Sequence, residues 1–170
     1  MINIVLYEPE IPQNTGNIMR TCVATNSKLH LIRPFGFSLD NKTIKRSGVN
    51  YIDKLEYYVY DDFLDFKLKN VGTYYFFTRY GNKPHSDFSY DIEENIYLIF
   101  GKESTGIPKE ILKENISNCV RIPMSKNVRA LNLSNSVVIA IYEVLRQNEY
   151  KSLLKFEPHK ENYLEDYFKS

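Results

Sequence analysis

The sequence predicts an α/β protein with a mainly parallel sheet and helices on both faces. Short apolar runs, each as long as a buried strand, alternate with helical patterns along most of the 170 residues. The longest helical pattern, Leu133 to Gln147, repeats apolar residues at i, i+4, i+7 and i+8. We expect one domain, with a core over about residues 1–150 and a polar extension over 151–170.

In the N-terminal part, two apolar runs predict buried strands, one from Ile2 to Tyr7 and one from Lys28 to Ile32. Between them, Asn14 can cap a helix over Gly16 to Ala24, because an asparagine side chain accepts from the free N–H groups of a first turn. Arg20 belongs to the polar side of this helix, so it should face away from the core.

Three further strands are predicted at Leu55 to Tyr60, Thr73 to Phe77 and Ile96 to Phe100. Asp61 or Asp62 can cap a helix that runs to about Asn70. Strand and helix therefore keep alternating, which is typical of a parallel sheet whose ligands bind beyond the carboxyl ends of the strands.

The last strand and helix are joined by a polar loop. A strand from Val120 to Met124 should run out at Pro123, because proline lacks the donor that a central ladder needs. The helix after the loop can be capped by Asn132 or Ser134. Apolar or aromatic residues also lie partly off its main face, which indicates either a second subunit on that side or a deeply buried helix; they are Val138, Ile139 and Tyr142.

Cysteine and histidine spacing gives no sign of a metal site. Cys22 and Cys119 stand alone in apolar surroundings and are expected to be buried thiols. His30, His85 and His159 are scattered, and we expect solvated or turn positions for them. The longest apolar run is far shorter than the ~18 residues of a membrane span, so we expect a soluble, cytoplasmic protein.

The net charge is only +1, but the charges are unevenly distributed. Residues 11–50 hold six basic side chains and one acidic, residues 51–70 hold three basic and five acidic, and residues 121–151 return to a net +3. Three basic residues share one face of a short helix that Asp40 can cap, and an anionic partner would explain them; they are Lys42, Lys45 and Arg46. A coincidence of solvated faces is the alternative.

The loop Gly101 to Pro108, GKESTGIP, is rich in residues that permit tight turns. It is not a Walker loop, since Gly106 is followed by Ile107 and Pro108. No GxGxxG follows the first strand, so the dinucleotide fingerprint is absent as well. A glycine turn beside Glu103 at a strand end suits a small cofactor approached by backbone groups, and a simple βα turn explains the loop equally well.

Three segments together resemble the three motifs of the SpoU family of RNA ribose methyltransferases, in the SPOUT superfamily. They are PQNTGNIMRT at residues 12–21, IFGKESTGIP at 99–108, and IPM at 122–124 continuing through RALNLSNSV at 129–137. The resemblance covers about residues 1–150 and is strongest to small single-domain members that methylate the 2′-OH of the tRNA wobble nucleotide, a cytidine or uridine. It implies S-adenosylmethionine as methyl donor, a C-terminal trefoil knot, and homodimers whose active sites use both subunits.

The resemblance also implies roles for single residues. Those matching catalytic positions are Asn14, Arg20, Glu103, Asn132, Ser134 and Tyr142, although Tyr142 is equally explained as a packed interface residue. Those matching positions that line the methyl donor are Phe77, Thr78, Gly101, Ile122, Met124, Ala130 and Leu131. Many relatives have serine where this chain has Ala130, so no hydroxyl is available there. The expected RNA contacts are Lys42, Lys45 and Arg46, with Lys126 and Arg129 as the second candidate patch.

Methyl transfer to a ribose hydroxyl needs help with deprotonation, because the hydroxyl is too weak an acid to ionise at neutral pH. A guanidinium stays protonated, so we assign Arg20 to orienting a phosphate and stabilising the developing alkoxide. The chemistry requires no metal. Methylation of another tRNA or rRNA nucleotide, or RNA binding by a catalytically silent member, remains open, and the missing fingerprint disfavours an oxidoreductase.

Overall fold

The computed structural model describes residues 1–38, 52–159, 164 and 168. The elements in chain order are β1 Ile2–Tyr7, α1 Pro12–Ala24, β2 Lys28–Ile32, η1 Ile52–Lys54, β3 Tyr57–Tyr60, α3 Phe63–Lys69, β4 Thr73–Phe77, β5 Lys83–Pro84, η2 His85–Asp87, β6 Ile96–Phe100, α4 Lys109–Lys113, η3 Ile116–Asn118, β7 Cys119–Arg121 and α5 Leu133–Gln147, where η marks a 3-10 helix. The expected helix at Asp40 lies outside the described residues.

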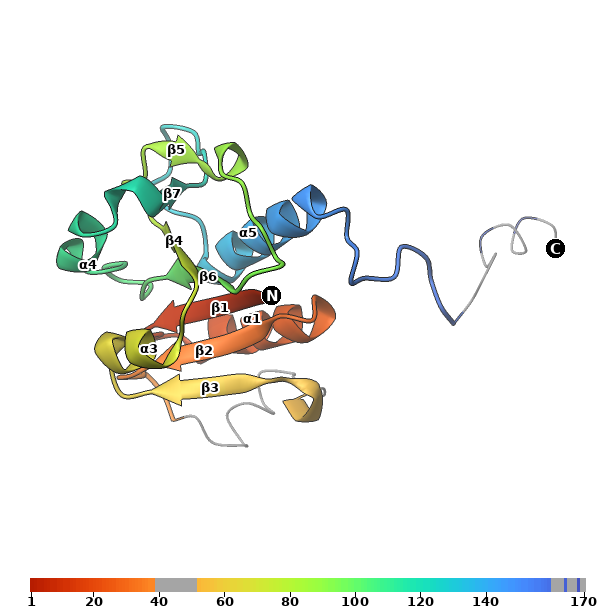
Figure 1. Ribbon diagram of the computed structural model, residues 1–170, viewed down its shortest axis with the longest axis horizontal. Coiled ribbons are helices and arrows are strands. Elements are labelled where there is room, and N and C mark those ends of the chain that lie inside the picture. The colour runs from red at the N-terminus through yellow and green to blue at the C-terminus, as the bar shows by residue number, and fades with distance from the viewer. Residues whose placement is uncertain (39–51, 160–163, 165–167, 169–170) are drawn as a thin grey trace.

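The strands form one seven-stranded sheet in the order β3-β2-β1-β6-β4-β7-β5. Every strand pairing within the described residues is parallel, which confirms the predicted sheet type. β1 lies inside the sheet, with Val5 opposite His30 of β2 on one side and Ile99 of β6 on the other. Figure 1 shows these strands side by side, so their carboxyl ends share one edge of the sheet.

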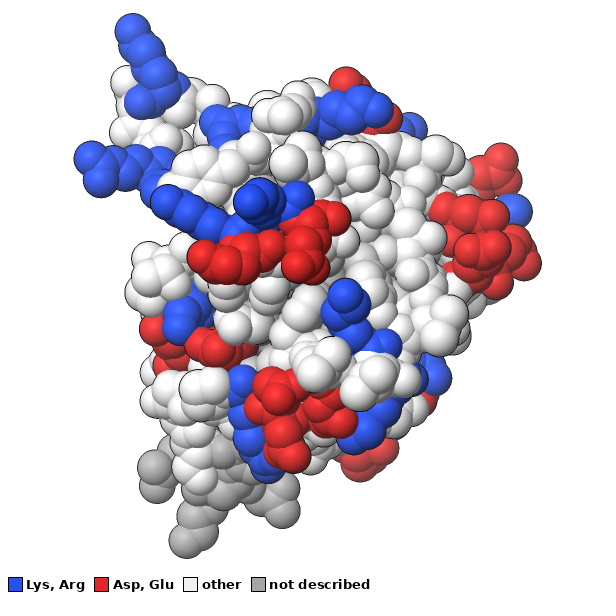
Figure 2. Space-filling model, turned by 60° about the vertical axis from the view of Figure 1, so that its left-hand side comes forward, with Lys and Arg blue, Asp and Glu red and all other residues white. Residues whose placement is uncertain are grey.

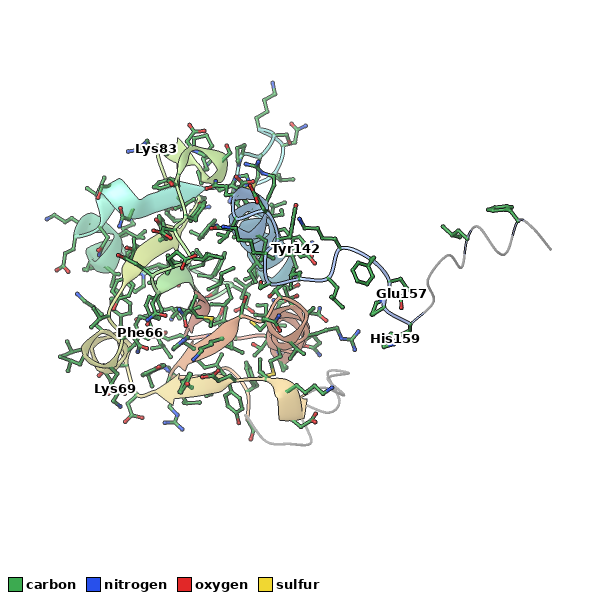
Figure 3. All side chains as sticks on the ribbon, turned by 45° about the vertical axis from the view of Figure 1, so that its right-hand side comes forward. Phe66, Lys69, Lys83, Tyr142, Glu157 and His159 are labelled. Atoms are coloured by element: carbon green, nitrogen blue, oxygen red, sulfur yellow. The ribbon has the colours of Figure 1, made fainter. Side chains whose placement is uncertain are left out.

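Helices cover both faces of the sheet, as predicted. Successive side chains along a strand point to opposite faces, so the apolar strands need a covering layer on each face. Ile4 and Leu6 of β1 pack on the side of α1 and α5, whereas Val5 packs on the side of α3 and α4. α1 and α5 also contact each other. Figure 3 shows Phe66 on α3 and Tyr142 on α5, the helices of the two opposite layers.

Several element ends differ from the prediction. α1 begins at Pro12 instead of Gly16, so Asn14 lies within the first turn and does not cap the helix. Proline is favoured at a first helical position, where its missing N–H would be unpaired anyway. The last strand ends at Arg121 instead of Met124, and the strand expected from Leu55 begins at Tyr57. Asn132 is the N-cap of α5, and Asp62 caps α3, as predicted.

His30 is neither solvated nor in a turn, contrary to the expectation. It lies in β2, only 3% exposed, with Nδ1 2.8 Å from the Tyr60 hydroxyl and Nε2 3.1 Å from Asn3 Oδ1. Because an amide oxygen only accepts, Nε2 carries the hydrogen and Nδ1 accepts from Tyr60. Both cysteines are buried free thiols, as expected.

The described part of the C-terminal extension leaves the folded body beyond α5 (Figure 1). Glu157 and His159 lie along it in Figure 3, and the side chains of Leu154 and Phe156 are exposed. The extension begins at a contact in which Asn26 Nδ2 donates to the carbonyl of Ser152 at 3.1 Å. Among the described residues, no helix is long and apolar enough to cross a membrane.

Candidate active site

A cavity of about 650 Å³ opens at the carboxyl ends of the central strands. Its walls come from the loops that follow β4, β6 and β7, together with the start of α1. Phe77 and Phe100, the paired last residues of β4 and β6, stack with ring centroids 4.7 Å apart beneath it. A parallel sheet thus presents three loops from distant parts of the chain to one space.

All seven residues that the sequence assigned to the methyl donor line this cavity. They are Phe77, Thr78, Gly101, Ile122, Met124, Ala130 and Leu131. Of the predicted catalytic residues, Asn14, Glu103 and Asn132 line it too. The three sequence motifs therefore converge on one site.

The loop after β6 is a tight turn that the glycines make possible. Gly106 has φ +76°, a left-handed conformation that side chains rarely adopt, and its N–H donates to the Lys102 carbonyl at 2.9 Å. A Cβ on Gly101 would lie 2.1 Å from the Gly106 carbonyl carbon. Both glycines are needed for the turn to fold back on itself and leave its backbone beside the cavity.

A chain of hydrogen bonds crosses the site and joins the three motifs. Asn132 accepts from the Ser134 N–H at 2.9 Å through Oδ1 and donates through Nδ2 to Asn14 Oδ1 at 3.0 Å. Asn14 Nδ2 then donates to Glu103 Oε1 at 2.9 Å. Because the backbone N–H can only donate and the carboxylate only accept, both amides have one possible orientation. The capping residue of α5 is thereby tied to α1.

The Glu103 carboxylate has three donors and serves to hold the start of α1. Besides Asn14, it accepts from the N–H groups of Glu10 at 2.9 Å and Ile11 at 3.3 Å. Ile11 is the N-cap of α1 and has no side-chain acceptor of its own. An acid from the second motif therefore fixes the two residues that directly precede α1.

The remaining predicted catalytic residues do not line the cavity. Ser134 is buried and donates its hydroxyl to Asn132 Oδ1 at 2.7 Å, so it supports Asn132. Arg20 is exposed on α1, six residues beyond Asn14 and thus about 9 Å further along the helix. Tyr142 is 44% exposed on α5.

The two candidate RNA patches have different outcomes. Lys42, Lys45 and Arg46 lie outside the described residues. Lys126 and Arg129 are exposed in the loop between β7 and α5, whose neighbouring residues Met124 and Ala130 line the cavity. Figure 2, which turns the α4 side of the molecule forward, shows basic side chains projecting at its upper left, a group of mostly acidic ones at its right edge, and acidic and basic ones side by side elsewhere.

Sequence reasoning missed several residues at the cavity. Arg79 and Tyr80 line it, and the Arg79 guanidinium lies 4.8 Å from the centre of the Tyr80 ring. Lys102 and Ser104 also line it, and they contact Glu8 and Glu10 on the loop after β1. Basic residues, tyrosines and serines are common in polar loops, so no local pattern singled out these four cavity residues.

Comparisons with known proteins agree with this geometry. A family model described as SpoU rRNA Methylase family matches residues 1–142. A Bacillus subtilis protein named as a candidate tRNA (cytidine(34)-2′-O)-methyltransferase is 48% identical over 155 residues, which cover 89% of this chain and 96% of the relative.

Solved structures share the fold. A candidate RNA methyltransferase from Bacillus anthracis has a TM-score of 0.88 and 47% identity, covering 92% of this chain and 100% of that one. A structure concerned with 2-OH methylation of C/U34 on tRNA has a TM-score of 0.82 and 38% identity, covering 89% and 98%. An AdoMet-bound rRNA methyltransferase from Sinorhizobium meliloti, 21% identical, shares the fold at a TM-score of 0.74 over 85% of this chain and 56% of that one.

Proposed function

The chain belongs to the SpoU methylase family, and we propose that it transfers a methyl group from S-adenosylmethionine to the ribose 2′-OH of the wobble nucleotide of tRNA, a cytidine or uridine. The observation that carries the proposal is the convergence of the three motif segments on one cavity, joined through Asn132, Asn14 and Glu103. The relatives' names supply the nucleotide.

The cavity fits the proposed donor in size and chemistry. Its volume of about 650 Å³ lies within the range of pockets that enclose a ligand of this size. The stacked Phe77 and Phe100 give an apolar floor, and the Gly101–Gly106 turn offers backbone groups beside it. The residues proposed to hold the donor are Phe77, Thr78, Gly101, Ile122, Met124, Ala130 and Leu131.

When bound, S-adenosylmethionine supplies an electrophilic methyl group on a sulfonium. Transfer forms the O–CH3 bond on the ribose as the S–CH3 bond breaks, S-adenosylhomocysteine leaves as the neutral thioether, and the hydroxyl proton is released to solvent water. Asn14 and Asn132 keep fixed orientations at the cavity, held by Glu103 and by the cap of α5. We assign Arg20 to orienting the adjacent phosphate and to stabilising the negative charge that develops on the ribose oxygen.

We propose a homodimer in which the exposed side of α5 is the interface and each active site uses both subunits. Val138 and Tyr142 lie one turn apart on α5 and are 38% and 44% exposed, whereas Ile141 on the other side of the helix is fully buried. Arg20 and Tyr142 do not line the cavity of their own chain. A second copy packed on this side can bring them to the partner's site.

The proposal includes the architecture of the family. We propose that residues 1–170 form one methyltransferase domain and that the segment after β7 passes through a trefoil knot. Support for one domain comes from the single seven-stranded sheet, and support for the knot comes from the membership of the SpoU methylase family. A tRNA substrate implies a cytoplasmic location.

The decisive experiment incubates the protein with labelled S-adenosylmethionine and either total tRNA or total rRNA, followed by nucleoside analysis and mapping. We expect 2′-O-methylcytidine or 2′-O-methyluridine at tRNA position 34 and no product in rRNA. Label at another tRNA position or in rRNA would overturn the assigned nucleotide. Binding of S-adenosylhomocysteine and tRNA without any transfer would identify a silent RNA-binding member.

A further inference from the structure

Two acidic residues hold the first and second motif loops together in a reciprocal way. Glu103 of the second loop accepts from the N–H groups of Glu10 and Ile11 of the first. Glu10 of the first loop accepts from Ser104 of the second, from its N–H at 2.9 Å and from its hydroxyl at 2.8 Å. Each loop thus contributes one carboxylate, which accepts hydrogen bonds from the other loop. We call Glu10, Glu103 and Ser104 the clasp.

An ion pair strengthens the same junction. Lys102 Nζ lies 2.6 Å from Glu8 Oε2, with side chains only 28% and 19% exposed. This contact raises the pKa of Lys102, and the two bonds from Ser104 lower the pKa of Glu10. Glu8 has φ +49°, a left-handed conformation that is uncommon outside glycine and that marks a constrained position at the end of β1.

The clasp connects the cavity wall to the helix that carries the first motif. On one side, residues 102–106 line the cavity. On the other side, α1 begins at Pro12, directly after Ile11. The segment of Gly36 packs closely on the Glu10 backbone, because a Cβ on Gly36 would lie 2.6 Å from the Glu10 carbonyl oxygen, and the Gly36 N–H donates to the Pro9 carbonyl at 3.0 Å. Movement of Ser104 therefore displaces the wall of the cavity relative to Asn14.

We propose that Glu10 is a positioning residue that sets the Ser104 turn against the start of α1, so that donor pocket and first-motif helix are assembled as one unit. The proposal rests on the function proposed above, because it takes this cavity as the donor pocket. Glu10 acts through its two hydrogen bonds to Ser104, which a neutral side chain of the same shape can also make. This distinction separates it from an ordinary surface acid.

The test compares Glu10→Ala with Glu10→Gln. Glutamine can accept from the Ser104 N–H through its oxygen and donate to the hydroxyl oxygen through its nitrogen, so it keeps both bonds without the charge. We expect Glu10→Ala to weaken S-adenosylhomocysteine binding about tenfold in titration calorimetry and to lower kcat as well. Glu10→Gln should stay within about threefold of the wild type. Glu110→Ala, an exposed acid on α4, is the matched control and should change neither quantity.

Unchanged affinity and kcat in Glu10→Ala would overturn the proposal. Equal losses in the Ala and Gln variants would also overturn it, since they would assign the effect to charge. If Glu10→Ala fails to fold, Ser104→Ala removes only the hydroxyl bond and should give a smaller loss of affinity, whereas wild-type affinity would count against the clasp. If the wild type binds S-adenosylhomocysteine but methylates no tRNA, the proposed function fails while the binding comparison still decides the role of Glu10.

Discussion

We propose that Arg20 orients the RNA phosphate and stabilises the charge that develops on the ribose oxygen. It is exposed on α1 and does not line the cavity of its own chain. We expect Arg20→Ala to abolish methyl transfer, by at least about a hundredfold, while S-adenosylhomocysteine affinity stays within a few fold. Arg20→Lys should also be poor, since a planar fork is replaced by a point charge. Loss of S-adenosylhomocysteine binding in either variant would contradict the division of roles between α1 and the later loops.

His30 links the stability of the sheet to pH. Burial, with a smaller effect of Lys28, lowers its pKa from 6.5 to about 4. Between about pH 6.5 and pH 4, His30 is protonated in the unfolded chain but neutral in the folded protein. The free energy of unfolding therefore falls as the pH falls through this window, by up to about 3 kcal/mol.

Urea unfolding at pH 7 and pH 4.5 measures this contribution. The loss between the two pH values should be smaller in His30→Gln than in the wild type. His159→Gln, in the exposed extension, is the control and should keep the full loss. An equal loss in all three proteins would show that His30 does not titrate differently on folding.

Variants of helix α5 can test folding and the proposed association separately, because its two apolar sides differ in exposure. Ile141 is fully buried and Val138 is 38% exposed. Ile141→Asp should therefore unfold the chain, at a cost of at least about 3 kcal/mol. Val138→Asp should leave the fold intact and dissociate the proposed dimer. Thermal unfolding and sedimentation velocity measure the two effects, with Leu68→Asp on the exposed side of α3 as control. A stable wild-type monomer at micromolar concentration would refute the interface.

Helices and strands were predicted correctly where the local sequence pattern alone determines them. Apolar runs located β1, β2, β4 and β6, because a short run of apolar residues is itself the pattern of a buried strand. The start of α1 was predicted wrongly because Asn14 was taken as its cap, whereas the Asn14 side chain donates to Glu103, 89 residues away in the sequence. β5 and α4, with two and five residues, are too short to show a period.

For the whole molecule, too, residues within sequence motifs could be predicted, whereas contacts between distant segments could not. Motif residues were assigned from their resemblance, and the parallel sheet brings those proposed to hold the methyl donor to a single cavity. Glu8 and Glu10 were missed because their partners Lys102 and Ser104 lie 94 residues away. The buried environment of His30 was missed for the same reason, since Asn3 and Tyr60 come from β1 and β3. Contacts between distant strands and loops are the part that pattern cannot supply.

We expect the methyltransferase body itself to recognise tRNA, and two basic patches are candidates for the contact surface. Phosphate contacts position an RNA without reading its sequence, so removing them should weaken binding to all tRNAs alike. Changing Lys42, Lys45 and Arg46 together to glutamine should reduce the salt slope, which is the slope of log K for tRNA binding against log salt concentration. The reduction should be roughly 0.7 to 0.9 for each phosphate that is no longer neutralised, and S-adenosylmethionine affinity should stay unchanged.

Lys126 and Arg129 should behave differently, because their loop also supplies Met124 and Ala130 to the cavity. Changing both to glutamine should lower turnover as well as the salt slope, since a displaced loop disturbs the donor pocket. Lys67→Gln on α3 is the control for the removal of a surface charge, and its slope should equal that of the wild type. The measurement is tRNA binding over a range of salt concentrations beside single-turnover methylation. If the triple variant keeps the wild-type slope and the loop variant does not, the phosphate contacts belong to Lys126 and Arg129 and not to residues 42–46.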